Sequence, residues 1–256
     1  MLSHEGPDRT HRHNQLLAGY LALIAGSVNS AGFILIGSFT SHVTGNVGRF
    51  ADDLALHRSA APFAMLLVLA YFGGALLASM AIESNVVRAR SMVYGGLLVA
   101  EAALLAAFAV LSYVMDTSNP RFHDVQGILL CVAMGMQNSF VTRLSGAVVR
   151  TTHLTGVVTD LGIESARWFR AWRARLSART RIRLVAGDAP ATPPQRPRTM
   201  LLLTIVAAFF IGSAVGALLA ARWGQLALLG PMLALLAGGT WAMLGSPELR
   251  LRRDVA

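Results

Sequence analysis

The feature that most constrains this chain is a series of apolar stretches, each of roughly twenty residues, the length that a helix needs to cross a bilayer core. They lie approximately at residues 15–38, 62–82, 91–115, 125–145, 199–222 and 224–244. Only 14% of the residues are charged, whereas soluble domains carry roughly 25%. The sequence therefore predicts an all-α integral membrane protein with six transmembrane helices in one transmembrane domain, 1–256.

The distribution of arginine predicts the orientation of these spans. All 22 basic residues are arginine. If the N-terminus is cytoplasmic, most of them fall in the two tails and in the loops after the second and fourth spans, as the positive-inside rule requires. We expect a multi-pass protein of the bacterial inner membrane with both termini in the cytoplasm. Because this topology explains the net charge of +9, no nucleic acid partner is expected.

Two polar segments at the exits of apolar stretches resemble one another. SFTSHVTGNVGRF at 38–50 and RTTHLTGVVTDLG at 150–162 share a histidine and a Thr-Gly pair at matching positions. We call them the TG segments. Upstream, the Asn-Ser pair at 29–30 recurs at 138–139, and downstream GALLAS from Gly74 matches GALLAA from Gly216. These matches, which occur in the same order in both halves, predict an internal repeat.

The predicted repeat units cover about 15–115 and about 125–245, and the second contains an Arg-rich insert at about 167–198. Each unit holds three spans. Since three is odd, the second unit enters the membrane from the opposite side, which is the construction of many secondary transporters. The fold class expected is two inverted three-helix repeats, with a short half-helix after each TG motif.

In each TG segment a threonine is expected to cap a helix too short to span the membrane. The free N–H groups at such a helix start attract anions and polar solutes. The alternative is an ordinary capped helix at the membrane interface, but the duplication favours a shared central site. The residues expected to bind substrate are Asn29, Thr44, Gly45, Asn46, Gln137, Asn138, Thr155 and Gly156.

Polar residues inside the spans leave alternatives open. Asn29 and Asn138 either bond a neighbouring helix or face a central cavity. Glu101, near the middle of the third span, is a candidate for proton coupling, or a neutral acid bonded to another helix. His42 and His153 lack accompanying ligands, so we expect no metal and no cofactor. Without a nucleophile–base motif, no enzyme is expected.

The Arg-rich insert mixes arginine with tryptophan and phenylalanine. Basic segments with aromatic residues beside a span are typical of helices that lie on anionic lipid. We expect a cytoplasmic surface helix that contacts the anionic cytoplasmic leaflet. The residues expected at this lipid surface are Arg167, Trp168, Arg170, Trp172 and Arg173.

Three motifs together resemble the YoaK family of bacterial multi-pass inner-membrane proteins. They are the Thr-Gly-Asn at 44–46, the Gly-x-Gln-Asn at 135–138 and the Arg-Thr-Thr-His-x-Thr-Gly at 150–156. The resemblance implies six spans and an unassigned biochemical activity. That family commonly has aspartate in the first span where this chain has Asn29, which weakens any proton-coupled mechanism at this position.

Two functions of different classes follow. The first is a transporter or permease for a small polar or anionic solute, with its site between the two repeats. The alternative is a non-transporting membrane scaffold, sensor or lipid-interacting protein that acts through the basic insert. Self-association into a homo-oligomer is compatible with either function.

Overall fold

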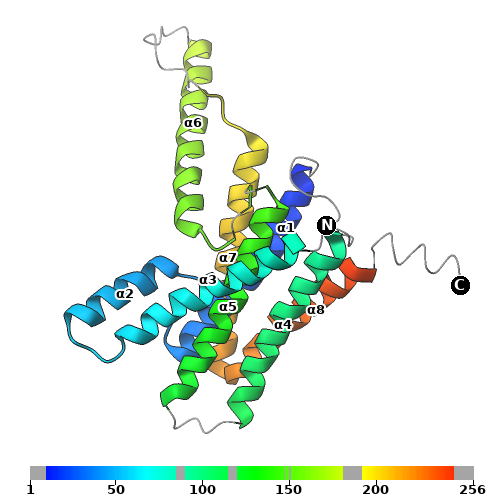
Figure 1. Cartoon of the computed structure of the whole chain (residues 1–256). Helices are drawn as coiled ribbons and strands as arrows, with labels where there is room; N and C mark the ends of the chain where they lie inside the picture. The colour runs from blue at the N-terminus through cyan, green and yellow to red at the C-terminus, as the bar shows by residue number, and fades with distance from the viewer. Residues whose placement is uncertain are drawn as a thin grey trace, which may run out of the picture.

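The computed structural model describes residues 10–84, 90–114, 120–146, 148–149, 151–180 and 192–244. Within these ranges the chain forms helices joined by turns and loops, and no strand (Figure 1). The helices are α1 (His11–Ile36), α2 (Val43–Ala55), α3 (Ala61–Ser84), α4 (Arg90–Val114), α5 (Pro120–Leu144), α6 (Leu154–Thr180), α7 (Arg196–Trp223), the 3-10 helix η2 (Gly224–Leu228) and α8 (Leu229–Leu244).

Among the described residues, 5 helical stretches are long and apolar enough to cross a membrane. α1, α3, α4 and α5 supply one each, and the fifth, Arg196–Leu244, comprises α7, η2 and α8. The chain reverses at η2, so that α8 returns beside α4 (Figure 1). All six predicted spans therefore lie on helices, and the length and composition of the stretches mark the chain as a membrane protein.

The long helices pack in three pairs: α1 along α7, α3 along α5, and α4 along α8. Glycines permit the close approach in the first two pairs. A Cβ atom added at Gly26 of α1 would lie 2.2 Å from the Phe209 carbonyl oxygen of α7. A Cβ atom added at Gly135 of α5 would lie 2.0 Å from the Tyr71 carbonyl oxygen of α3. Both crossings exclude any larger residue.

A second glycine supports each of these crossings and fixes the register between the two halves. A Cβ atom at Gly74 would lie 2.1 Å from the Val132 carbonyl oxygen, and one at Gly212 would lie 2.0 Å from that of Leu23. By these contacts Gly74 matches Gly212, whereas Gly216, which the GALLA match pairs with Gly74, lies about one turn further along α7, where an added Cβ would lie 2.3 Å from the Ser27 carbonyl oxygen.

The pair α4 and α8 approach one another at a third glycine crossing. Cβ atoms added at Gly95 and at Gly239 would each lie 2.7 Å from the other residue's carbonyl oxygen. Each glycine also lies against the side chain four residues after the opposite glycine: Gly95 against Met243, and Gly239 against Val99. The contact between α4 and α8 is therefore reciprocal.

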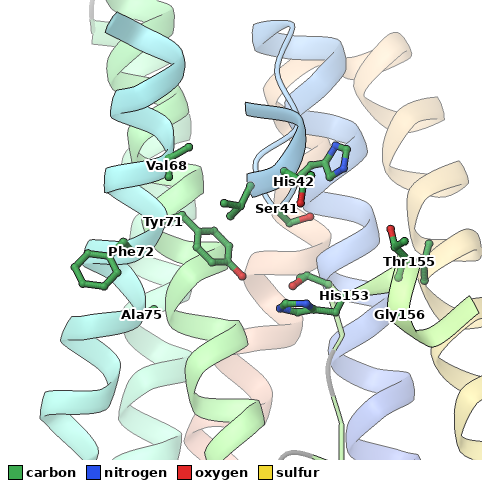
Figure 2. A pocket seen from close by; sticks show the side chains of 13 residues that line it. Ser41, His42, Val68, Tyr71, Phe72, Ala75, His153, Thr155 and Gly156 are labelled. Atoms are coloured by element: carbon green, nitrogen blue, oxygen red, sulfur yellow. The ribbon is translucent and has the colours of Figure 1, made fainter. Parts of the chain in front are cut away.

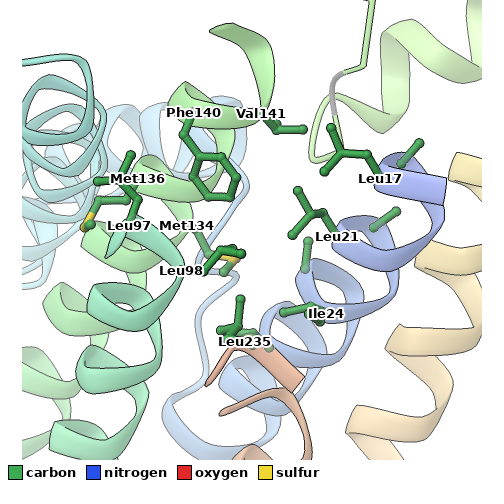
Figure 3. Close-up of a cluster of buried hydrophobic side chains, with 14 of the residues drawn as sticks. Leu17, Leu21, Ile24, Leu97, Leu98, Met134, Met136, Phe140, Val141 and Leu235 are labelled. Atoms are coloured by element: carbon green, nitrogen blue, oxygen red, sulfur yellow. The ribbon is translucent and has the colours of Figure 1, made fainter. Parts of the chain in front are cut away.

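The core lies where α1, α4, α5 and α8 meet (Figure 3). Leu21, Leu98, Met134 and Leu235 are fully buried there. In contrast, α3 and α7 expose large apolar side chains, including Phe72 and Leu77 on α3 and Phe210 and Leu218 on α7. Such outward-facing apolar surface is what a bundle surrounded by lipid presents.

The helices that follow the two TG motifs differ in length. α2 is a short helix of 13 residues, as predicted. α6 is one continuous helix of 27 residues that extends beyond the bundle (Figure 1). The prediction of a second short half-helix followed by a separate surface helix is therefore wrong. No Gly or Pro follows Gly162 within α6, so nothing in the chain breaks the helix. Residues 181–191 of the predicted insert lie outside the described residues.

Candidate functional site

The first TG segment follows α1 through a short loop. Gly37, with a φ of 69°, ends α1, since this left-handed conformation suits glycine. The Asn29 side-chain oxygen then accepts hydrogen bonds from the Ser41 N–H at 3.1 Å and from the Ser41 hydroxyl at 2.9 Å. Asn29 thus anchors the loop to α1.

The second TG segment follows α5 in a similar way. The Ser145 hydroxyl oxygen accepts the Val149 N–H at 3.0 Å, and Gly146 has a φ of 62°. These contacts turn the chain at the end of α5 and lead it toward Thr152 and His153, immediately before α6.

The two TG segments meet at one pocket with a volume of about 610 Å³. Figure 2 shows Ser41 and His42 on one side, His153 and Thr155 on another, and the Tyr71 side chain pointing between them. Residues 41–44, residues 152–156 and four residues of α3 line the pocket; the α3 residues are Val68, Tyr71, Phe72 and Ala75. Segments from the two halves of the sequence thus form a single site.

The starts of α2 and α6 both border this pocket. His42 occupies the N-cap position of α2 without a side-chain capping bond, and α6 begins at Leu154. The first helical bonds run from Asn46 to the His42 oxygen and from Val157 to the His153 oxygen, both at 3.1 Å. The prediction that Thr44 and Thr155 cap these helices is therefore wrong, because both lie inside the first turn. The N–H groups of 43–45 and 154–156 have no acceptor within their helices.

The pocket has a mostly apolar lining with a few polar groups, and no carboxylate or guanidinium group of a described residue lines it. Its described lining contains no Asp, Glu, Arg or Lys, and its polar groups are imidazoles, hydroxyls and one phenol. The Tyr71 hydroxyl faces Thr152 and Asn138. The Asn138 side-chain oxygen is buried and has no hydrogen-bond partner among the described residues. Two helix N-termini, which carry partial positive charge, border the site.

A family model described as "Protein of unknown function (DUF1275)" matches residues 17–241, from α1 to α8. The chain belongs to this family. The match includes both TG segments and every described pocket-lining residue. No curated protein and no solved structure matches the chain. The resemblance to the YoaK family rests on the three sequence motifs alone.

In this DUF1275 protein, only some of the expected substrate-binding residues line the pocket. Thr44, Thr155 and Gly156 do, and Asn138 lies beside Tyr71. The others support the surrounding structure, as their contacts show. A Cβ atom at Gly45 would lie 2.5 Å from the His42 Nδ1, so glycine leaves room for that ring.

The two remaining amides are buried elsewhere. Asn46 donates to the Phe39 carbonyl oxygen at 3.4 Å, and Gln137, which is fully buried, donates to the Leu21 carbonyl oxygen at 3.5 Å. Neither is among the residues that line the pocket. Both amides hold elements around the site together, which is the commonest use of an amide inside a membrane bundle.

Sequence reasoning did not select the other polar residues of the pocket, which are Ser41, His42, Tyr71, Thr152 and His153. The two histidines recur in matched positions of the TG segments, which was a signal that they belong to one site. The structure brings them to one pocket. Among the described residues, no group of three or more His, Cys, Asp or Glu side chains is placed to hold a metal ion.

Glu101 lies in the interior of the bundle. Its side chain is fully buried, and neither carboxyl oxygen has a hydrogen-bond partner among the described residues. Tyr20 of α1 is the ionisable neighbour, and its hydroxyl donates to the Ala234 carbonyl oxygen of α8 at 2.5 Å. Glu101 does not line the pocket.

Two buried acids hold the TG helices in place, and they occupy matching positions when the two TG segments are aligned. Asp53 of α2 is 4% exposed and pairs with Arg58, in the loop before α3, at 3.4 Å. Glu164 of α6 is 0% exposed and accepts the Gln195 N–H, at the start of α7, at 3.2 Å. Sequence reasoning did not find this pair, although continuing the repeat alignment past the glycines would have revealed it.

The expected lipid-surface residues divide into two groups. Arg167 pairs with Glu164, and the Trp168 indole N–H donates to the Thr199 hydroxyl at 3.0 Å. Arg167 thus pairs within α6 and Trp168 contacts α7, and their position at the lipid surface stays a prediction. Arg170, Trp172 and Arg173 are all exposed on α6.

Proposed function

We propose that this DUF1275 protein is a transporter or permease, and not an enzyme, that moves a small polar or anionic solute across the bacterial inner membrane. Both termini lie in the cytoplasm in this proposal. The observation that carries it is the convergence of the two TG segments, one from each half of the chain, on a single pocket.

The helix packing supports an inverted pair of three-helix units. In this arrangement α1 corresponds to α5 and α3 to α7, so that the α1–α7 contact is the counterpart of the α5–α3 contact. The glycine crossings at Gly26 and Gly135 agree with this exchange, and α4 and α8 meet reciprocally at Gly95 and Gly239. Transporters built from inverted repeats bind their substrates near the midplane, between the units, at helix starts of this kind.

The chemistry of the pocket favours a small solute with acceptor groups. Two sets of unpaired N–H groups, with the hydroxyls of Thr44 and Thr155, can donate hydrogen bonds. No described lining residue is acidic, so nothing in the wall repels an anion. The volume of about 610 Å³ lies inside the range of roughly 300–1,000 Å³ that small-molecule sites occupy.

Within this proposal, Glu101 remains the candidate for proton coupling. A carboxyl buried without a cation or a hydrogen-bond donor beside it is far less costly to hold neutral than charged. A proton that enters or leaves this group would change the charge of the bundle interior. Intramembrane carboxyls with this environment are functional candidates by default.

A thermal-stability screen of small solutes on the purified protein tests the proposal. A ligand at 100 times its Kd stabilises the folded protein by about 2.7 kcal/mol. Thr44→Val and Thr155→Val should remove the shift, and also uptake of the same solute into vesicles. Thr159→Val is the matched control, because the Thr159 hydroxyl donates its hydrogen bond to the Thr155 carbonyl oxygen of its own helix and does not line the pocket. Unchanged binding and uptake in both the Thr44→Val and the Thr155→Val variants would contradict the shared-site proposal.

The rival function, a scaffold or sensor that acts through the basic segment, is favoured by one observation: α6 extends beyond the bundle (Figure 1). Deleting 170–191 removes this extension and spares the contacts of Glu164 and Trp168 with α7. If the deletion reproduces the growth defect of a strain without the gene while solute uptake is unchanged, the rival function is supported. If only substitution of Thr44 or Thr155 reproduces that defect, transport is supported.

A further inference from the structure

We infer that an exposed apolar stripe on α6 docks onto anionic phospholipid headgroups at the membrane surface. The stripe consists of Val158, Phe169, Trp172 and Leu176, whose spacings of three, four and eleven positions place them on one side of a helix. They are 51%, 56%, 55% and 48% exposed. The surface is separate from the pocket, so this inference stands independently of transport.

The contacts between α6 and α7 set the level of the stripe relative to the bilayer. α7 begins with Arg196 and Arg198 and continues as an apolar run, and arginines at the end of such a run mark the membrane interface. Trp168 is hydrogen-bonded to Thr199 and lies under the Arg196 guanidinium at 5.9 Å. Trp168 is thus at interface level, and Phe169 and Trp172 follow within about one turn.

Aromatic side chains favour this level, since their rings are apolar and their edges can meet water. The Phe169 and Trp172 rings pack together with centroids 5.8 Å apart. They form a compact apolar cluster on the exposed surface of α6.

The charge around the stripe selects an anionic surface over other occupants. Arg170, Arg173 and Arg175 accompany the aromatic residues, and no acid follows Glu164 in α6. A helix with apolar residues beside clustered arginines binds the anionic lipids of the cytoplasmic leaflet. A second copy of the chain would offer the same basic helix and would repel it.

Bromolipid quenching of a single tryptophan tests this docking in the full-length protein. Trp172 is kept and the other three tryptophans are changed to Phe, and the protein is placed in nanodiscs of headgroup-proximal brominated phosphatidylglycerol or phosphatidylcholine. We expect quenching in phosphatidylglycerol discs and at least a twofold lower quenching in phosphatidylcholine discs. Arg170→Gln with Arg173→Gln should lower the phosphatidylglycerol value to the phosphatidylcholine value.

A variant that keeps only Trp241 is the control for folding and for insertion into the disc. Trp241 lies on α8 and is 80% exposed, so its quenching should depend neither on lipid charge nor on the arginines. No quenching of Trp172 in either disc, with Trp241 quenched normally, would overturn the inference. Equal quenching of Trp172 in both lipids, unchanged by the arginine substitutions, would overturn the anionic specificity.

Discussion

The close contacts at the glycines between helices predict how much stability a Gly→Ala substitution should remove. We expect Gly135→Ala and Gly26→Ala each to destabilise the bundle, because the added Cβ would lie 2.0 Å and 2.2 Å, respectively, from a backbone carbonyl oxygen of the neighbouring helix. A backbone oxygen cannot move aside as a side chain can. The two substitutions should have similar effects, since they touch matched crossings.

The helices must separate locally by about 1 Å to restore an ordinary carbon–oxygen contact of roughly 3.3 Å. A gap of that size removes between a quarter and a half of the van der Waals attraction across the crossing. In lipid no hydrophobic effect between helices compensates for that loss. Overpacking of this kind costs about 1–3 kcal/mol, which corresponds to a fall in Tm of roughly 2–10 °C for a chain of this size.

The assay is thermal unfolding of the purified protein in one detergent, followed by tryptophan fluorescence. Gly73→Ala and Gly96→Ala are matched controls, because both glycines lie within spans and nothing lies within 4 Å of a Cβ added there. We expect the controls to keep the parental Tm. If Gly135→Ala and Gly26→Ala unfold at the same temperature as the controls, the close crossings of α3 with α5 and of α1 with α7 are wrong.

Three further predictions concern other parts of the molecule. Glu164→Ala should destabilise by about 1–3 kcal/mol, because it removes the charged acceptor that the Arg167 side chain and the Gln195 N–H share, and should open α6 to limited proteolysis. Asp160→Ala, which breaks a half-exposed pair with Arg198, should cost about 1 kcal/mol or less. Glu101→Gln should leave the Tm nearly unchanged and abolish uptake driven by a pH gradient; gradient-driven uptake that persists would remove Glu101 from coupling. For the third prediction, cysteines replace Thr44 and Thr155, and a protease site is inserted between α4 and α5. After treatment with a short bifunctional thiol reagent and cleavage, the two fragments should stay linked. Two separate fragments on a denaturing gel would contradict the shared pocket.

Hydropathy predicted the long helices well, because lipid requires each span to be a continuous apolar helix of a fixed minimum length. The boundaries of α3 and α4 differ only slightly from the predicted spans at each end. The end of the fifth span was predicted as closely, at 222 against Trp223 at the end of α7, but the form of the turn that follows was not. The run through α7, η2 and α8 is apolar throughout, so composition does not show that the turn contains a 3-10 helix.

The repeat predicted that the TG segments belong together, but not how each residue is used. Asn29 and Thr44 both carry polar groups near the site, and only the fold shows that Asn29 bonds Ser41 while Thr44 lines the pocket. Tyr71 gave no signal, because an aromatic residue in an apolar span is typical of packing. The continuity of α6 was available from the sequence, since no helix breaker separates Gly162 from Thr180.

Accessibility of the pocket from both sides of the membrane tests the central claim most directly. Cysteine is introduced at Thr44 or at Thr155 in a background in which Cys131, the buried native cysteine, is replaced by serine. A membrane-impermeant thiol reagent is then applied to right-side-out and to inside-out membrane vesicles. Transport through a shared pocket predicts that each cysteine reacts from both sides. Reaction of each cysteine from one side only would contradict it.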